Sequence, residues 1–211
     1  RVEAEALAHP LLAPSHAVAN DVVVGPPGTV LLVTGSNMAG KSTLLRAVAA
    51  NAVLAQADAP ACARRLRLPS LAVHTSMRVS DSLEAGVSLF LAELLRLRQI
   101  VDAARAWRPG QPAVLYALDE ILHGTNTAER QVAARRILGH LLAHGAIGLV
   151  STHDLALANT PELRAAAVPA HFREELGSGD GVAAMRFDYV LRPGLATSSN
   201  ALKLMELMGL G

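Results

Sequence analysis

The sequence predicts an α/β protein in which a mostly parallel sheet is covered by helices on both faces. Short apolar runs alternate along the chain with longer segments of helical periodicity, as in folds that join parallel strands through helices. One apolar run ends in a glycine-rich turn that leads into a helix. Hydrophobic residues make up 51% of the chain and aromatic residues only 3%, so Ala, Leu and Val must build most of the core.

Length and composition restrict the class of protein. The 211 residues suit one domain, with a β-like N-terminal segment at 1–29 and a core at 30–211. A net charge of +1 does not favour nucleic acid or an anionic membrane as a partner. Cys62 is the only cysteine, which excludes an internal disulfide framework and suits the cytoplasm. No apolar run reaches the roughly 20 residues of a membrane span. Because the chain starts at Arg1 without a signal peptide, we expect a C-terminal piece of a longer protein.

Strands are predicted from the apolar runs. In the proline-broken segment 1–29 we expect one short β-like run, at 22–24. Compact apolar runs are typical of buried parallel strands, and they occur at 30–34, 113–118 and 147–151. Further strands are expected at 72–78 and 185–191. The glycine-rich segment 175–181 indicates a hairpin turn or a flexible loop.

Helices are predicted at residues 42–56, 82–106 and 126–144. The second is amphipathic, with Leu83, Val87, Phe90, Leu91, Leu94, Leu97 and Val101 at helical spacing. A turn with the sequence WRPGQP at 107–112 separates it from the next strand. The third begins with Asn126 followed by Glu129, which is the pattern of a helix N-cap.

A phosphate-binding loop is the most specific local signal. Residues 35–42, GSNMAGKS, match G-x-x-x-x-G-K-[ST] at every fixed position, between a predicted strand and a predicted helix. Glycines allow backbone N–H groups to face phosphate oxygens, and the helix adds its positive end. Lys41 would reach the β- and γ-phosphates, and the Ser42 hydroxyl would bind Mg²⁺. This context favours a nucleotide site over a glycine-rich turn with a solvated lysine. The site would comprise Gly35, Ser36, Asn37, Met38, Ala39, Gly40, Lys41, Ser42 and Thr43.

An acidic pair, Asp119 and Glu120, follows the apolar run at 113–118. In a Mg-nucleotide hydrolase the first carboxylate holds the water shell of the metal, and the second can take a proton from the attacking water. Such a pair can also cap the next helix. The phosphate loop upstream favours the hydrolytic interpretation.

Two further segments have both a structural and a functional interpretation. His153 ends the next predicted strand in STHD, where it could sense the γ-phosphate or orient the water, although a lone histidine is more often structural. The position of His153 at the end of the strand that follows the acidic pair favours the functional role. Ser88 and Gly86 lie at a helix start in SDSLEAGVSLFLAE and could face an anion. Ordinary capping by Asp81 or Ser82 explains that segment equally well.

Together these motifs resemble the ATPase domain of the MutS family of DNA mismatch-repair proteins. The match is carried by TGSNMAGKST, SDSLEAGVSLFLAE, LDEILHGTNT and STHD, in the family's order and spacing, and by the closing segment PGLATSSNALKLMELMGL. Asn37 and Met38 make the first motif more specific than a general phosphate loop. The loops around these motifs are more similar to the shorter MutS-like branches of the family.

The resemblance implies an ABC-class P-loop ATPase that works as a homodimer with composite ATP sites. Asp119 and Ser42 would then serve Mg²⁺, Glu120 would be the base, His153 would sense the γ-phosphate, and Ser88 would reach the nucleotide of the partner. ATP or ADP would be the ligand, and DNA would be bound through domains absent from this chain. In the family the stretch SHAVAND at 15–21 seats adenine, through Val18 and Asn20 here, but Ala17 replaces the family's usual aromatic residue.

Two other classes of ATPase-like protein are alternatives to a DNA-linked ATPase. An ABC-type transport ATPase would need an L-S-G-G-Q run before the acidic strand, and residues 105–112 contain none. A nucleotide-dependent structural dimeriser with little turnover would not need Glu120. The densest basic run, ARRLRLPS at 63–70, is expected to be a solvated edge strand rather than a DNA contact.

Overall fold

The computed structural model describes residues 1–36, 38–77, 89–122, 126–154, 156, 160–177 and 184–196. A six-stranded sheet in the order β5-β6-β7-β3-β8-β9 forms the centre of the molecule. From β5 to β8 the neighbours pair in parallel, and β9 pairs antiparallel to β8. The bounds of these strands are Val30–Thr34 (β3), Leu71–Ser76 (β5), Ala113–Asp119 (β6), Ile147–Thr152 (β7), Ala167–Gly177 (β8) and Ala184–Pro193 (β9).

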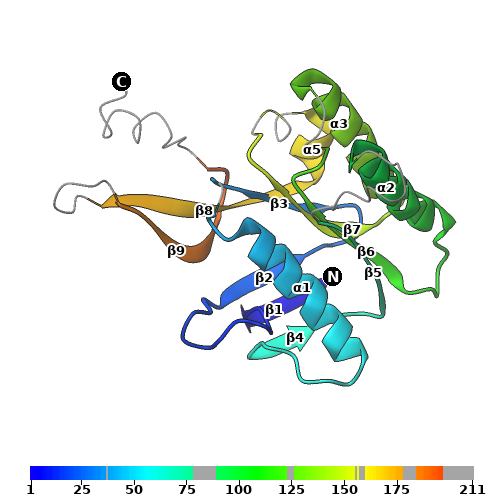
Figure 1. The fold of residues 1–211 in the computed structure, drawn as a ribbon. Helices are drawn as coiled ribbons and strands as arrows, with labels where there is room; N and C mark the ends of the chain where they lie inside the picture. Colours follow the sequence, from blue (N-terminus) through cyan, green and yellow to red (C-terminus); the bar gives the residue numbers. More distant parts are fainter. Residues whose placement is uncertain are drawn as a thin grey trace.

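Helices cover both faces of this sheet (Figure 1). Helix α1 (Lys41–Gln56) packs on one face, and α2 (Leu89–Ala106), α3 (Thr127–Ala143) and α5 (Pro161–Ala166) lie on the other. Strand β3 is buried along its whole length, so its alternating side chains enter two cores. Leu31 and Val33 join the core under α1, whereas Val30 and Leu32 join the core under α2 and α3. A mixed α/β fold with a mostly parallel sheet is therefore confirmed.

A second sheet lies beside α1 in the order β2-β1-β4. Its strands are β1 (Val2–Leu7), β2 (Asn20–Val24) and β4 (Arg65–Arg67), all antiparallel. Strand β4 pairs with β1 and exposes both of its arginines, so the solvated edge strand predicted for the basic run is confirmed. The expectation of a single β-like run before residue 30 is wrong. Ala and Glu are poor strand formers, and β1 is stabilised by its two neighbours and by the burial of Val2, Ala4 and Leu7.

The other predicted elements agree closely with the structure, and the differences concern β8 and α5. Asn126 caps α3, because its side chain accepts a hydrogen bond from the Glu129 N–H at 2.9 Å. Strand β8 and helix α5 were not predicted, and β8 extends to Gly177, into the segment expected to be a turn or loop. Strand β8 pairs antiparallel with β9, as a hairpin requires, and residues 178–183 between them lie outside the described ones. The predicted boundaries between residues 78 and 88 lie outside the described residues.

The sheet order brings three carboxyl ends together. Strand β7 lies between β6 and β3, and all three run in parallel, so Thr34, Asp119 and Thr152 end at one edge. In open α/β sheets this edge is where ligands bind. Within the ranges that the structure describes, no helix has the length and apolarity needed to cross a bilayer.

Candidate nucleotide site

The loop between β3 and α1 requires glycine at two positions. The backbone φ angles are 137° at Gly35 and 104° at Gly40, in the left-handed region that L side chains rarely adopt. A Cβ on Gly35 would lie 3.0 Å from the Phe172 carbonyl oxygen, and one on Gly40 would lie 3.1 Å from Cδ1 of Tyr189. Met38 is also left-handed, with φ 71°. The loop is therefore a tight, specific turn, and of its residues Asn37 lies outside the described ones.

The turn ends at the N-terminus of α1. Gly40 is the N-cap residue, and no side chain of the described residues makes a cap hydrogen bond there. The first N–H groups of an α-helix have no acceptor within the helix, so they are available to an anion. Ser42 and Thr43 lie in this first turn and line the adjacent cavity.

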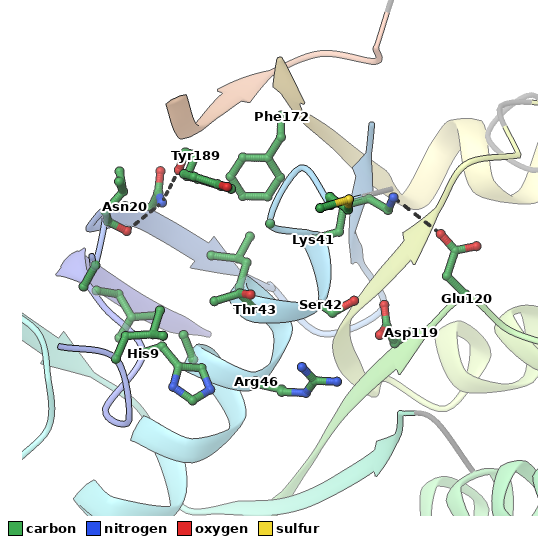
Figure 2. A pocket seen from close by; sticks show the side chains of 18 of the residues that line it. His9, Asn20, Lys41, Ser42, Thr43, Arg46, Asp119, Glu120, Phe172 and Tyr189 are labelled. Atoms are coloured by element: carbon green, nitrogen blue, oxygen red, sulfur yellow. Dashed lines mark hydrogen bonds and ion pairs between the residues drawn. The ribbon is translucent and has the colours of Figure 1, made fainter. Parts of the chain in front are cut away.

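Lys41 connects the loop with the acidic pair. Its side chain is only 5% exposed, and Nζ donates to the carbonyl oxygens of Gly35 at 2.8 Å and Ser36 at 2.9 Å. The same Nζ lies 3.5 Å from Oε1 of Glu120, as the dashed line in Figure 2 shows. A buried cation is thus held by neutral carbonyl groups and one carboxylate at the mouth of the loop.

The acidic pair is held by β7. Asp119 is the last residue of β6, and its Oδ1 accepts a hydrogen bond from the Ser151 hydroxyl at 2.5 Å. The Glu120 N–H lies 3.2 Å from both the carbonyl oxygen and Oγ of Ser151. Glu120 has a left-handed φ of 54°, and its Oε2 lies 2.5 Å from Nδ1 of His153. The strand ends therefore fix both carboxylates in place.

The opposite wall comes from distant parts of the chain. Phe172 of β8 and Tyr189 of β9 line the cavity together with Val18 and Asn20. The Asn20 side chain donates to the Tyr189 carbonyl oxygen at 3.0 Å and accepts from the Leu191 N–H at 2.7 Å. Figure 2 shows Tyr189 and Phe172 next to each other beside the loop. The Asn20 amide is thus occupied in joining β2 to β9.

A single cavity of about 1230 Å³ connects these parts. It brings together ten of the predicted site residues, namely Val18, Asn20, Ser36, Met38, Gly40, Lys41, Ser42, Thr43, Asp119 and Glu120. Ala39 is buried in the core beneath the loop, Gly35 forms the turn, and His153 reaches the site through Glu120. Ser88 lies outside the described residues.

Sequence reasoning missed several cavity residues. Phe172 and Tyr189 stand on strands without a recognisable site motif, and one of these strands was not predicted at all. His9 and Arg46 line the cavity as well. Burial and the nearby Arg46 guanidinium lower the pKa of His9, which favours a neutral imidazole on this wall. Only the aromatic character of Phe172 and Tyr189, in a chain with 3% aromatic residues, could have drawn attention to them.

Comparisons with known proteins give relatives over most of the chain. DNA mismatch repair protein MutS 2 of Halobacterium salinarum is 35% identical over 197 residues, which are 91% of this chain and 21% of the relative. MutS 2 of Haloarcula marismortui is 35% identical over 180 residues, 84% of this chain and 18% of the relative. MutS of Natronomonas pharaonis is 34% identical over 180 residues, 84% of this chain and 20% of the relative. The chain spans about a fifth of the length of these curated relatives.

A family model described as MutS domain V matches residues 31–211. The matched range contains the phosphate loop, the acidic pair, His153 and both aromatic residues of the cavity. Val18 and Asn20 precede it. Because the match covers most of the sequence and agrees with the relatives, the chain belongs to the MutS domain V family.

Proposed function

We propose that this chain is the Mg²⁺-dependent ATPase module, of the ABC class of P-loop proteins, in a MutS-like DNA repair or recombination protein. The observation that carries the proposal is the cavity of about 1230 Å³ at the carboxyl edge of the sheet. A tight glycine-containing loop, a buried lysine, two carboxylates and an aromatic wall all meet there. A triphosphate with an attached base needs these features in one place.

The phosphate groups would lie on the loop formed by residues 35–43. In the structure Lys41 donates to two neutral carbonyl groups. Anionic phosphate oxygens form stronger, charge-assisted hydrogen bonds with an ammonium group, so they would compete well for Nζ. The positive φ angles at Gly35, Met38 and Gly40 and the uncapped start of α1 supply the backbone donors.

Mg²⁺ would be held by the Ser42 hydroxyl and the Asp119 carboxylate. Both are hard oxygen donors and line the same cavity. Mg²⁺ usually keeps several waters and takes one or two carboxylates plus phosphate oxygens, so this small donor set fits. The hydrogen bond from Ser151 orients Asp119 for this role. When bound, the ion would neutralise charge on the phosphates.

Glu120 would act as the general base. Its carboxylate lies in the cavity between Lys41 and His153, where it could accept the proton of an attacking water. His153 orients this carboxylate through the 2.5 Å contact, and by resemblance it would also sense the γ-phosphate. The base of the nucleotide would lie against Tyr189 and Phe172, which supply the aromatic surface that Ala17 does not.

The larger protein would couple nucleotide state to a DNA clamp. The relatives are named DNA mismatch repair proteins, which supports a role on DNA carried out by domains outside this chain. Two copies would form composite sites, with Ser88 of each chain acting on the nucleotide of the other. The three relatives named above are mismatch repair proteins, which favours a role on DNA over a transport ATPase. The dimeriser with little turnover differs from our proposal in requiring no Glu120.

The first experiment is calorimetric titration of ATP into the full-length protein and its Lys41→Ala variant. Hydrogen bonds to charged groups contribute about 1.5 to 3 kcal/mol each, so losing Nζ should weaken ATP binding by at least roughly 100-fold. Arg98→Ala is the matched control, because it removes an exposed cation of α2 that does not line the cavity. Equal ATP affinity in wild type and Lys41→Ala would refute the nucleotide site.

A further inference from the structure

A hydrogen bond joins helix α2 to the turn that carries Glu120. Oε1 of Glu93 accepts from the backbone N–H of Leu122 at 2.7 Å. Glu93 lies in α2, which packs against β5 and β6, and it also lines the cavity. A charge-assisted bond of this length is stronger than a bond between neutral groups. The turn after β6 is thereby tied to a helix that precedes it by about thirty residues.

This turn is strained and needs external support. Glu120 has φ 54° and Leu122 has φ 58°, and neither is glycine. The left-handed conformation costs roughly 1–2 kcal/mol for each such residue. Among the described residues, the turn is supported by Ser151, which binds the Glu120 N–H, by the burial of the Leu122 side chain, and by Glu93, which binds the Leu122 N–H. Without the last contact, the Leu122 N–H would lose its acceptor and the strained turn one of its supports.

We infer that Glu93 is a positioning residue for Glu120: its carboxylate fixes the left-handed turn that aims the Glu120 side chain at the cavity. The inference rests on the proposed ATPase function. Glu93 acts on the backbone of the turn, whereas Glu120 contacts Lys41 and His153. A misplacement of about 1 Å at a reacting group can cost about 100-fold in rate, so loss of this tie should lower turnover without removing the nucleotide site.

The test measures ATP turnover and nucleotide affinity in the full-length protein. Glu93→Ala should reduce kcat by roughly 10- to 100-fold and leave the Kd for ATP within a factor of about three. Glu93→Gln should recover most of kcat, because its amide oxygen can accept the same hydrogen bond. Asp102→Ala removes an exposed carboxylate from the same helix and should turn over like wild type. If Glu93→Ala does not fold, Glu93→Asp, which keeps the charge but shortens the reach, replaces it with the same expectation.

A double variant separates positioning from a structural or direct chemical role. In a Glu120→Gln background, Glu93→Ala should lower the residual rate by less than about twofold, because the group that it positions is already lost. A full additional loss would overturn the inference, and so would failure of Glu93→Gln to recover activity. Wild-type turnover by Glu93→Ala in an active protein would overturn the role of Glu93 alone. If the unaltered protein does not hydrolyse ATP, or if Lys41→Ala hydrolyses it equally fast, the proposed function and this role are both overturned.

Discussion

The His153 and Glu120 side chains are in close contact in the candidate site, with Nδ1 and Oε2 2.5 Å apart. If the Glu120 carboxylate is ionised, it can only accept, and Nδ1 then carries the hydrogen of this contact. A neutral imidazole then has only an acceptor at Nε2. To donate to a phosphate oxygen as well, His153 must either gain a second proton or release Glu120. If His153 senses the γ-phosphate as proposed, this contact would link that sensing to the position of the Glu120 carboxylate.

The first prediction concerns Glu120→Gln. The amide keeps the size of the side chain but cannot take a proton from water, so hydrolysis should slow by roughly 100-fold or more while ATP binding persists. The change also removes the negative charge 3.5 Å from Lys41, which gives no reason for weaker phosphate binding. Single-turnover hydrolysis and calorimetric titration measure the two quantities.

Asp119→Asn is the companion variant for this prediction. It keeps the partner of the Ser151 hydroxyl but weakens the ligand for Mg²⁺, so a higher Mg²⁺ concentration should be needed for half-maximal turnover. Glu120→Gln should not share this shift. Equal turnover in wild type and Glu120→Gln would refute the base role, and equal rates near background would favour a structural dimeriser.

The second prediction separates the two roles of His153. Loss of the imidazole in His153→Ala removes this contact with Glu120 and should lower kcat by roughly 100-fold, the lower end of the range for a lost acid–base partner. If the ring also senses the γ-phosphate, the variant should lose part of its preference for ATP over ADP, which Glu120→Gln should retain. The ratio of the two Kd values measures this preference. An unchanged ratio with a reduced kcat would restrict His153 to orienting Glu120.

The sequence was sufficient for the elements whose signals are local. Strands β3, β6 and β7 are apolar runs buried on both faces, and the cap of α3 depends on Asn126 and Glu129 alone. Strands β1 and β8 escaped prediction because neighbouring strands, not their own composition, stabilise them. Pro169 within β8 also argues against a strand from sequence alone.

The candidate site also has a part that local sequence patterns predict and a part that they do not. The phosphate loop and the acidic pair are contiguous motifs, and the sheet order then brings them to one edge. The aromatic wall is not contiguous: the hydrogen bond from Asn20 to Tyr189 spans 169 residues of sequence. Such a contact depends on the register of β8 with β9 and on the position of the second sheet, neither of which a local pattern specifies.

The third prediction tests whether Ser88 acts in trans. By resemblance Ser88 would face the nucleotide of the partner, so Ser88→Ala and Lys41→Ala proteins should each be nearly inactive alone. In a mixed dimer, the intact loop of the Ser88→Ala chain meets the intact Ser88 of the Lys41→Ala chain. One of its two sites is complete, so mixing should restore part of the ATPase rate.

The control mixes Lys41→Ala with Glu120→Gln. Both changes affect the site formed by the chain's own phosphate loop, so no site in the mixed dimer is complete. If Ser88 acted within its own chain, both sites of the Ser88→Ala and Lys41→Ala dimer would be defective. Mass measurement shows whether mixed dimers form, and nucleotide trapping reports on single sites. Absence of recovery in mixed dimers that do form would count against action in trans. Full-length protein at high concentration keeps the dimer populated.

The last prediction assigns the nucleotide base to Tyr189. Its ring lies beside the loop, 3.1 Å from where a Cβ on Gly40 would be, and the side chain is 42% exposed towards the cavity and solvent. Stacking on an aromatic ring contributes roughly 1–3 kcal/mol per base, so Tyr189→Ala should raise the Kd for ATP by about 10- to 100-fold, whereas Tyr189→Phe should keep it. Val190→Ala, which changes an exposed neighbour on β9, is the matched control.

Inorganic tripolyphosphate has no nucleobase, so its Kd should be the same for wild type and Tyr189→Ala. An equal loss for tripolyphosphate and ATP would mean that Tyr189 supports the phosphate loop through Gly40 and does not hold the base.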